Sequence, residues 1–157
     1  MNKLPVTVIS ENSPQRALRV QPETGLDAVL EQLLTEEAPK SVFLLNEQGG
    51  LAGIVNLKEL LIWGWLHLGL LKTPFALSER KLRRLARGQT AVDLLIPNSQ
   101  QMTISQQATV AEAMDTLLVS NLDVVAVVDE NGRVVNDLHL EDLLAYAMRQ
   151  STESANG

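Results

Sequence analysis

Hydrophobic residues recur with helical spacing in two separate stretches of the chain. In each stretch they fall at i, i+3, i+4, i+7 and i+8, which predicts an amphipathic helix with one apolar stripe. The first set is Leu26, Val29, Leu30, Leu33 and Leu34, and the second is Val110, Ala113, Met114, Leu117 and Leu118. Thr109 and Glu112 have the spacing of a capping box at the second helix. Thr24 and Asp27 form a looser version of that pattern at the first helix.

Each predicted helix is followed by two short apolar runs that a polar turn connects. The runs predict strands, and the Asn, Asp and Gly residues between them predict hairpin turns. Residues 42–61 align without a gap to residues 125–144, with Asn46 opposite Asp129. The chain therefore contains an internal repeat. Each copy is predicted to contain a short extended segment, a helix, a strand, a turn, a second strand and a closing helix.

This order of elements predicts an α+β fold in which the two copies share a core. Two antiparallel strands alone are marginal in water, whereas two copies that pool their strands and helices can bury a common interior. The predicted organisation is repeat 1 over residues 1–70, a connector with a basic helix over 71–89, repeat 2 over 90–150, and a disordered polar tail over 151–157.

The connector contains a strongly basic segment. Ser78 is a candidate N-cap and Gly88 a candidate stop for this helix, with Leu82, Leu85 and Ala86 facing inward. Its five cations are Arg80, Lys81, Arg83, Arg84 and Arg87. A solvated connecting helix is one interpretation, and contact with phosphate or with an acidic partner is the other.

The apolar run at residues 60–71 raises the question of a membrane. It is twelve residues long, whereas a spanning helix needs about 20. A buried or interface helix is the better interpretation. Trp63 and Trp65 fall on different faces of it, so one can pack in the core while the other meets a partner. His67 in this run is predicted to be a packed or interface histidine.

Composition excludes several classes of function. The net charge of −6 disfavours nucleic-acid binding, because phosphate backbones require a basic surface. The absence of cysteine excludes disulfides, thiolate metal sites and cysteine nucleophiles. The N-terminal residues do not have the pattern of a signal peptide, so we expect a cytoplasmic protein.

The residues of the second copy carry a resemblance to a known family. The stretch "AVDLLIPNSQQMTISQQATVAEAMDTLLVSNLDVVAVVDENGRVV" resembles a CBS domain, including a hairpin similar to "PVVDENGRLVG" with Ala126 in place of the usual Pro. "RVQPETGLDAVLEQLL" and "VFLLNEQGGLAGIVNLKELL" extend the resemblance to the first copy. The resemblance implies a tandem pair, or Bateman module, in which two CBS repeats (each short strand–helix–strand–strand–helix) pack through their sheets about a pseudo-twofold axis. It also implies a homodimer without catalytic activity that senses adenosyl ligands in clefts between the repeats.

The family pattern places ligand contacts on the second strand and the next helix, as Gly, two apolar residues, Thr or Ser, two variable residues and Asp. In the first copy, Gly53, Ile54, Asn56 and Glu59 stand at the matching positions. Asn can replace the hydroxyl as a hydrogen-bonding group. Glu59 is one methylene longer than Asp and would require a shifted ribose.

The second copy departs further from this pattern. Asn136 replaces the Gly, Asp137 replaces an apolar residue, His139 replaces the hydroxyl residue, and Asp142 is kept. This polar cluster marks a site that is remodelled or lost. Ile104, like Val20 in the first copy, is a candidate for stacking on adenine.

The chain offers little for catalysis or metal binding. Asp137 and His139 fall on one face of a strand, but one His with scattered carboxylates is a thin ligand set, so no metal is expected. No Ser-His-Asp spacing, P-loop or paired-His motif is present, so we expect no enzyme activity and no required cofactor.

Two functions remain open. The first is a regulatory module that senses an adenosyl ligand such as AMP, ADP, ATP or S-adenosylmethionine through Val20, Gly53, Ile54, Asn56, Glu59, Ile104, His139 and Asp142. The second is a degenerate CBS pair that acts without ligand in dimerisation or in binding a partner protein. Nucleic-acid binding through residues 80–87 is a minor third interpretation, and no membrane partner is expected.

Overall fold

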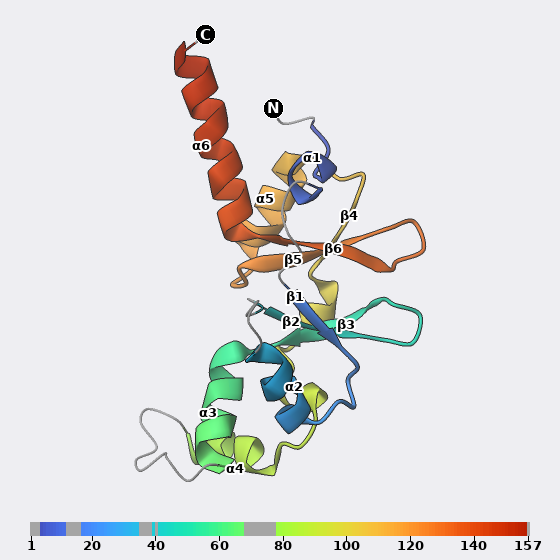
Figure 1. Cartoon of the computed structure of the whole chain (residues 1–157), viewed down its shortest axis with the longest axis vertical. Helices are drawn as coiled ribbons and strands as arrows, with labels where there is room; N and C mark the ends of the chain where they lie inside the picture. Colours follow the sequence, from blue (N-terminus) through green and yellow to red (C-terminus); the bar gives the residue numbers. More distant parts are fainter. Residues whose placement is uncertain (1–3, 12–16, 35–38, 40, 68–77, 157) are drawn as a thin grey trace. The chain divides into compact units, whose positions relative to one another are not determined.

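The chain is described here as a computed structural model that covers residues 4–11, 17–34, 39, 41–67 and 78–156. It divides into two compact units, each built on a three-stranded sheet (Figure 1). One unit contains residues 16–101 and the other contains residues 1–15 together with 102–157. The α+β class predicted from the sequence is confirmed. The packing of the two repeats about a pseudo-twofold axis stays a prediction.

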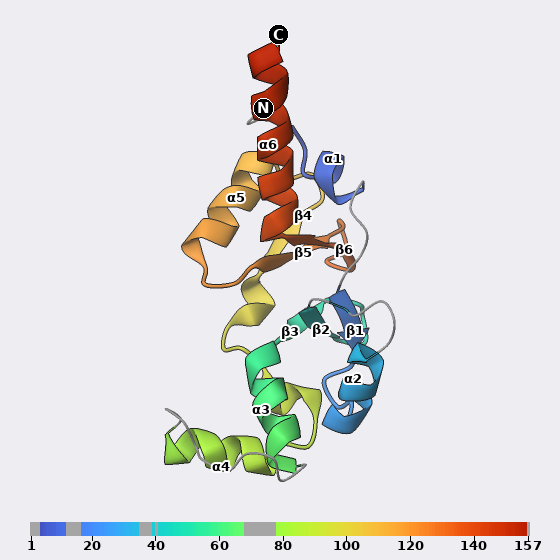
Figure 2. The same ribbon diagram turned by 60° about the vertical axis from the view of Figure 1, so that its left-hand side comes forward.

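The first unit is built on the sheet β1-β2-β3. Strand β1 (Ala17–Val20) pairs in parallel with β2 (Ser41–Leu45), which pairs antiparallel with β3 (Leu51–Val55). Helices α2 (Leu26–Leu33) and α3 (Leu57–His67) cover one face of this sheet (Figures 1 and 2). Helix α4 (Glu79–Arg87) packs beside α3, and the 3₁₀ turns η1 (Ala91–Leu94) and η2 (Ser99–Gln101) pack on β3.

The second unit repeats this plan on the sheet β4-β5-β6. Strand β4 (Thr103–Ser105) pairs in parallel with β5 (Val124–Val128), which pairs antiparallel with β6 (Val134–His139). Helix α5 (Val110–Val119) follows β4, and α6 (Leu140–Asn156) follows β6. The short N-terminal helix α1 (Thr7–Ser10) packs against β6 and α6.

The two hairpins are equivalent in detail. Asn46 Oδ1 accepts hydrogen bonds from the backbone N–H groups of Gln48 and Gly50, and Asp129 Oδ1 accepts from those of Asn131 and Arg133. Gly49 and Gly132 have φ values of 83° and 78°, a conformation that favours glycine. A register irregularity follows at equivalent positions, Leu44/Leu45 and Val127/Val128. The repeat identified in the sequence therefore extends to turn chemistry and register.

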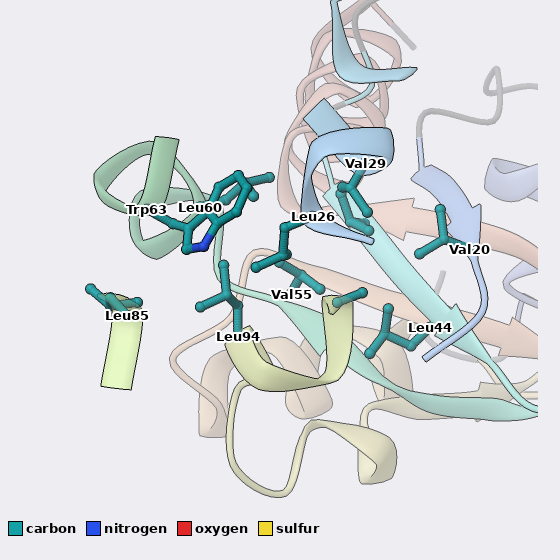
Figure 3. Close-up of a cluster of buried hydrophobic side chains, with 11 residues drawn as sticks. Val20, Leu26, Val29, Leu44, Val55, Leu60, Trp63, Leu85 and Leu94 are labelled. Atoms are coloured by element: carbon teal, nitrogen blue, oxygen red, sulfur yellow. The ribbon is translucent and has the colours of Figure 1, made fainter. Parts of the chain in front are cut away.

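A hydrophobic cluster joins the helices of the first unit to its sheet (Figure 3). Leu26 and Val29 of α2 meet Leu60 and Trp63 of α3 above Val55 of β3. Leu85 of α4 and Leu94 of η1 belong to the same cluster and are fully buried. Trp63 also donates a hydrogen bond from Nε1 to the carbonyl of Gly88 at 2.8 Å. The basic helix is therefore anchored in the core by its apolar face.

The boundaries of the units differ from the predicted domain limits. Residues 1–15 belong with the second repeat, although the sequence places them at the start of the first. The backbone N–H of Val6 donates to the carbonyl of Ala108, and that of Val110 donates to the carbonyl of Leu4. Residues 91–101 in turn belong with the first repeat. Each repeat thus packs with the entry segment that precedes the other, which periodicity cannot reveal.

Several local expectations are corrected by the structure. Residues 151–156, predicted as a disordered tail, continue α6, because extending a formed helix costs far less than starting one. Thr24 does not cap α2: Gly25 is the N-cap, and the Thr24 hydroxyl accepts from the N–H of Gln21. Ala86 is exposed, whereas Leu85 is buried. The predicted caps Thr109 and Ser78 are confirmed, as is the stop at Gly88.

The apolar sides of the two helices predicted from periodicity each end in an exposed residue. Leu34 and Leu118 occupy equivalent positions in the two repeats and are 83% and 76% exposed. Trp63 is buried and Trp65 is 45% exposed, as the opposite faces of the 60–71 run predict. Residues 68–71 of that run lie outside the described residues, as does the 71–77 part of the connector.

Candidate functional site

In the first repeat, the residues of the family pattern lie on β3 and the first turn of α3. Gly53 is in β3, where a side chain would overlap Cδ1 of Leu95 and lie 3.0 Å from its Cγ. The hydroxyl of Ser99 would be 3.1 Å away. The space beside Gly53 is therefore filled by the segment that follows η1.

Ile54 fixes that segment through its backbone. Its N–H donates to the Ser99 hydroxyl at 2.8 Å, and its carbonyl accepts from the N–H of Ile96 at 2.8 Å. The side chain of Ile54 is buried. Ile54 thus positions the wall formed by residues 95–97 and does not present its own side chain to solvent.

Asn56 begins helix α3. Its Oδ1 accepts from the backbone N–H groups of Lys58 at 3.0 Å and Glu59 at 3.3 Å, which is the role that Asn favours at a helix start. Its Nδ2 makes no hydrogen bond within the described part of the chain. This amide group remains available to a ligand.

Glu59 lies one turn into α3 and is held by two cations of α4. Its Oε1 is 2.7 Å from Arg84 Nη2 and 3.4 Å from Lys81 Nζ. Arg84 also donates from Nη1 to the carbonyl of Asp93 at 3.2 Å. The Glu59 side chain is only 11% exposed, so this pairing compensates a carboxylate that is largely removed from water.

Asp93 in turn organises the segment on which Arg84 rests. Its Oδ2 accepts from the backbone N–H groups of Gln89 at 2.9 Å and Thr90 at 3.0 Å. These hydrogen bonds stabilise the carboxylate and lower the pKa of Asp93.

A cavity of about 340 Å³ opens beside these groups. Its walls differ in chemistry: Leu95, Ile96 and Pro97 form an apolar side, Asn56 and Glu59 form a hydrogen-bonding side, and α4 supplies a basic side. The complete lining is Asn56, Glu59, Ser78, Arg80, Lys81, Arg84, Leu95, Ile96 and Pro97. We refer to it below as the Glu59 cavity.

Val20 does not share this cavity. It is buried in β1 and lines a different, open cavity of about 420 Å³ together with Arg19, Thr24 and Asn46. The sequence named both Val20 and Glu59 as candidate ligand contacts, whereas the structure places them in the linings of different cavities of the first unit.

In the second repeat, Asn136 stands at the position of Gly53 and makes a different contact. Its Nδ2 donates to the carbonyl of Ser10 at 2.7 Å, and Ser10 is buried. The polar residue that interrupts the predicted strand therefore holds α1 on β6. This contact is a structural reason for the departure from glycine.

The remaining polar residues of the second repeat form a buried cluster. His139 Nδ1 lies 3.2 Å from Asp137 Oδ2 and 3.9 Å from Asp142 Oδ2. Asp142 Oδ2 accepts from the backbone N–H of His139 at 2.9 Å, so this carboxylate supports the start of α6. All three residues are at most 7% exposed. Ile104 lines a separate cavity whose lining does not include His139 or Asp142.

The basic side of the Glu59 cavity was only partly foreseen. The sequence suggested phosphate contact by the 80–87 helix but gave no reason to place it beside Glu59. The available signal was charge: a largely buried Glu on an apolar helix needs a cation, and the connector contains five. The apolar wall at residues 95–97 had no comparable signal.

The described residues contain no group of three or more His, Asp or Glu side chains arranged to hold a metal ion. None of the helices that the structure describes has the length and apolar character needed to cross a membrane.

Comparison with known proteins identifies the fold. The family model described as CBS domain matches residues 92–149. Among solved structures, CBSX2 from Arabidopsis thaliana in complex with AMP is 20% identical, covers 94% of this chain and 98% of its own, and superimposes with a TM-score of 0.66. No curated protein matches the chain.

Two other solved structures agree. A CBS domain-containing protein from Thermotoga maritima is 15% identical, with 95% and 97% of the two chains covered and a TM-score of 0.69. The CBS domain pair of protein MJ0100, solved with 5-methylthioadenosine and S-adenosyl-L-methionine, is 16% identical, with 93% and 97% covered and a TM-score of 0.65. Residues 92–149 thus match the CBS family model, and the whole chain has the fold of the CBS-pair structures.

Proposed function

We propose that this chain is a regulatory module without catalytic activity that binds an adenosyl ligand in the Glu59 cavity. The observation that carries the proposal is the composition of this cavity, in which an apolar wall faces hydrogen-bonding groups. Residues 95–97 would contact the base, and Asn56 Nδ2 would donate to the ligand. The two relatives that were solved with AMP or with S-adenosyl-L-methionine support an adenosyl compound.

Glu59 would accept hydrogen bonds from the ribose hydroxyls. Both of its cation contacts are on Oε1, so Oε2 makes no hydrogen bond or ion pair with the described residues. Oε2 therefore keeps its acceptor capacity for a hydroxyl donor from a ligand.

Regulation would follow from the elements that the ligand contacts together. The Glu59 cavity is lined by the start of α3, by α4 and by the segment after η1. A ligand that binds best to one arrangement of these three elements shifts the protein toward that arrangement, and a partner protein can detect the change.

Thermal unfolding of the whole chain with AMP, ADP, ATP, S-adenosylmethionine and adenosine tests the proposal. A ligand at a hundredfold excess over its Kd adds about 2.7 kcal/mol, which corresponds to a Tm increase of about 5–10 °C for a chain of this size. Glu59→Gln should reduce this increase strongly, because the neutral amide is a weaker acceptor. Asp142→Asn, at the equivalent position of the second repeat, should keep it.

Two results would contradict the proposal. If no adenosyl compound raises the Tm of the wild-type chain, the sensor function is wrong. If Asp142→Asn removes the increase and Glu59→Gln does not, the ligand binds to the second repeat and the Glu59 cavity is not the site.

A second candidate function, self-association, is favoured by a specific observation. Both closing helices expose apolar residues at i, i+4 and i+8, and the two sets are equivalent in the repeat. They are Leu57, Leu61 and Trp65 on α3, and Leu140, Leu144 and Met148 on α6, each 36–68% exposed. We call these sets the apolar stripes. On α6 the stripe borders an apolar groove of about 160 Å³ lined by Leu117, Leu118 and Leu143 among others.

Such stripes are costly to leave in water. Because both repeats present one at the same position, we infer that a second copy of the chain covers them. Sedimentation equilibrium on the wild-type protein tests this candidate, and a monomer at every concentration would contradict it.

A further inference from the structure

The basic side of the Glu59 cavity comes from a helix that lies outside the part of the chain that matches the CBS family model. Arg80, Lys81 and Arg84 of α4 line the cavity, whereas the matched residues are 92–149. The cations are held in place, because the buried Leu85 and the Trp63–Gly88 hydrogen bond fix α4 to α3. Their position is therefore a built feature of the first unit.

The charges on this side are not balanced. Among the described residues that line the cavity, Glu59 is the one carboxylate against three cations, in a chain whose net charge is −6. Glu79, the acidic residue of α4, pairs with Arg83 at 2.6 Å, and neither residue lines the cavity. The Glu59 cavity is thus a local excess of positive charge on an acidic protein, which attracts anions.

The three cations differ in how many hydrogen bonds and ion pairs they already make with the described residues. Arg84 is engaged twice, by Glu59 Oε1 and by the carbonyl of Asp93. Lys81 has one contact, at 3.4 Å, through an ammonium group that can make three hydrogen bonds. Arg80 makes no hydrogen bond or ion pair with any residue that the structure describes. Arg80 and Lys81 therefore have donors to offer, while Arg84 holds Glu59 in position.

We propose that α4 makes the Glu59 cavity a site for a nucleoside polyphosphate, with Arg80 and Lys81 binding the phosphate groups. The nucleoside part of this inference rests on the proposed function, but the phosphate part rests on α4 alone. Arg80 supplies planar paired donors that suit phosphate oxygens, and Lys81 supplies a compact charge. The cavity should accordingly select for ligand charge as well as for the base.

Isothermal titration of the whole chain with adenosine, AMP, ADP and tripolyphosphate tests this inference. ADP should bind at least about tenfold more tightly than adenosine, because each charge-assisted hydrogen bond adds strongly to affinity. Raising the salt concentration should weaken ADP binding and leave adenosine binding unchanged, since only the phosphate contact is screened.

The informative substitution is Arg80→Gln, which removes a charge that has no structural partner in the described chain. It should lower the affinity for ADP about threefold to tenfold and leave the affinity for adenosine unchanged. Arg87→Gln is the matched control, because it removes the same charge from the same helix at a residue that does not line the cavity. Its effect on ADP binding should be less than about twofold.

The outcomes separate this inference from the proposed function. If ADP binds but Arg80→Gln acts no more strongly than Arg87→Gln, the adenosyl site survives and the phosphate site is wrong. If no adenosyl compound binds but tripolyphosphate binds in an Arg80-dependent manner, the phosphate site survives and the proposed function is wrong. If adenosine and ADP bind equally, the phosphate inference is overturned as well.

Discussion

The packing around Gly53 leaves no room for a Cβ atom. In the family pattern this glycine lets a ligand approach the backbone, whereas here the side chain of Leu95 occupies the space that a Cβ would need. The structure therefore gives the residue a packing role within the first unit. Gly64 on α3 provides the opposite case, because a Cβ there would meet only Leu30 Cδ1 at 3.4 Å.

Gly53→Ala should destabilise the protein by about 1–3 kcal/mol through overpacking against Leu95. Gly64→Ala should be neutral or stabilising by up to about 1 kcal/mol, since alanine favours a helix interior. Chemical denaturation of both variants measures these differences. The double variant Gly53→Ala/Leu95→Ala should destabilise by less than the sum of its single changes, and strict additivity would disprove the proposed clash.

At the same scale, the sequence predicted the hairpin turns and two of the caps correctly because each depends on residues a few positions apart. It named Val20, Glu59, Ile104 and Asp142 as ligand contacts through the order of the family pattern. The structure places Val20 and Glu59 in the linings of different cavities, and Ile104 lines a cavity whose lining does not include Asp142. The role of Ser99 at Ile54 could not be predicted, since it joins residues 45 positions apart.

Among the elements, α3 and α6 present the same chemistry on their exposed sides. Each begins after a strand of its hairpin, buries one side against its own sheet and leaves an apolar stripe outside. The sequence predicted these closing helices from the order of elements in the repeat, yet it could not state which apolar residues stay exposed. Helical periodicity places apolar residues on one side of a helix but does not state how much of that side the protein covers, as the exposed Leu34 and Leu118 of the α2 and α5 stretches also show.

Charges placed on both apolar stripes should prevent self-association. The double variant Leu61→Glu/Leu144→Glu puts a carboxylate at the centre of each stripe, where burial in an interface would cost several kcal/mol. We expect light scattering to show a dimer for the wild-type chain and a monomer for this variant, with unchanged circular dichroism. Val92→Glu, at a residue 45% exposed in η1 and outside the stripes, should remain dimeric. A double variant with wild-type mass would exclude the stripes as the interface.

For the whole molecule, the sequence predicted two repeats and the class of fold, and the compact units do not follow the limits of those repeats. A repeat found by alignment is contiguous, whereas the compact units are residues 16–101 and residues 1–15 with 102–157. Hydrogen bonds such as Val110 to Leu4 and Ile96 to Ile54 join segments across this boundary of the alignment. Periodicity contains no information on which copy an entry segment packs with.

This division makes a prediction about fragments. A fragment of residues 16–101 contains a complete unit and should unfold cooperatively, whereas a fragment of residues 1–89 lacks η1 and η2 and should not. Without residues 90–101, the buried Leu94 and the Ser99 hydroxyl are missing from β3, which removes several kcal/mol. Thermal unfolding followed by circular dichroism distinguishes the two fragments. Equal cooperativity would show that the entry segment is dispensable.

The exchange of entry segments also bears on how such a chain could arise. A gene that encoded one repeat alone would produce a polypeptide without the entry segment that packs on its repeat. Its own entry segment would have nothing to pack on. Two such polypeptides could complete each other by trading these segments, which is the logic of domain swapping. Gene duplication followed by fusion would then convert an intermolecular exchange into an intramolecular one. After fusion, substitutions such as glycine to Asn136 could accumulate in one copy while its twin kept the older pattern.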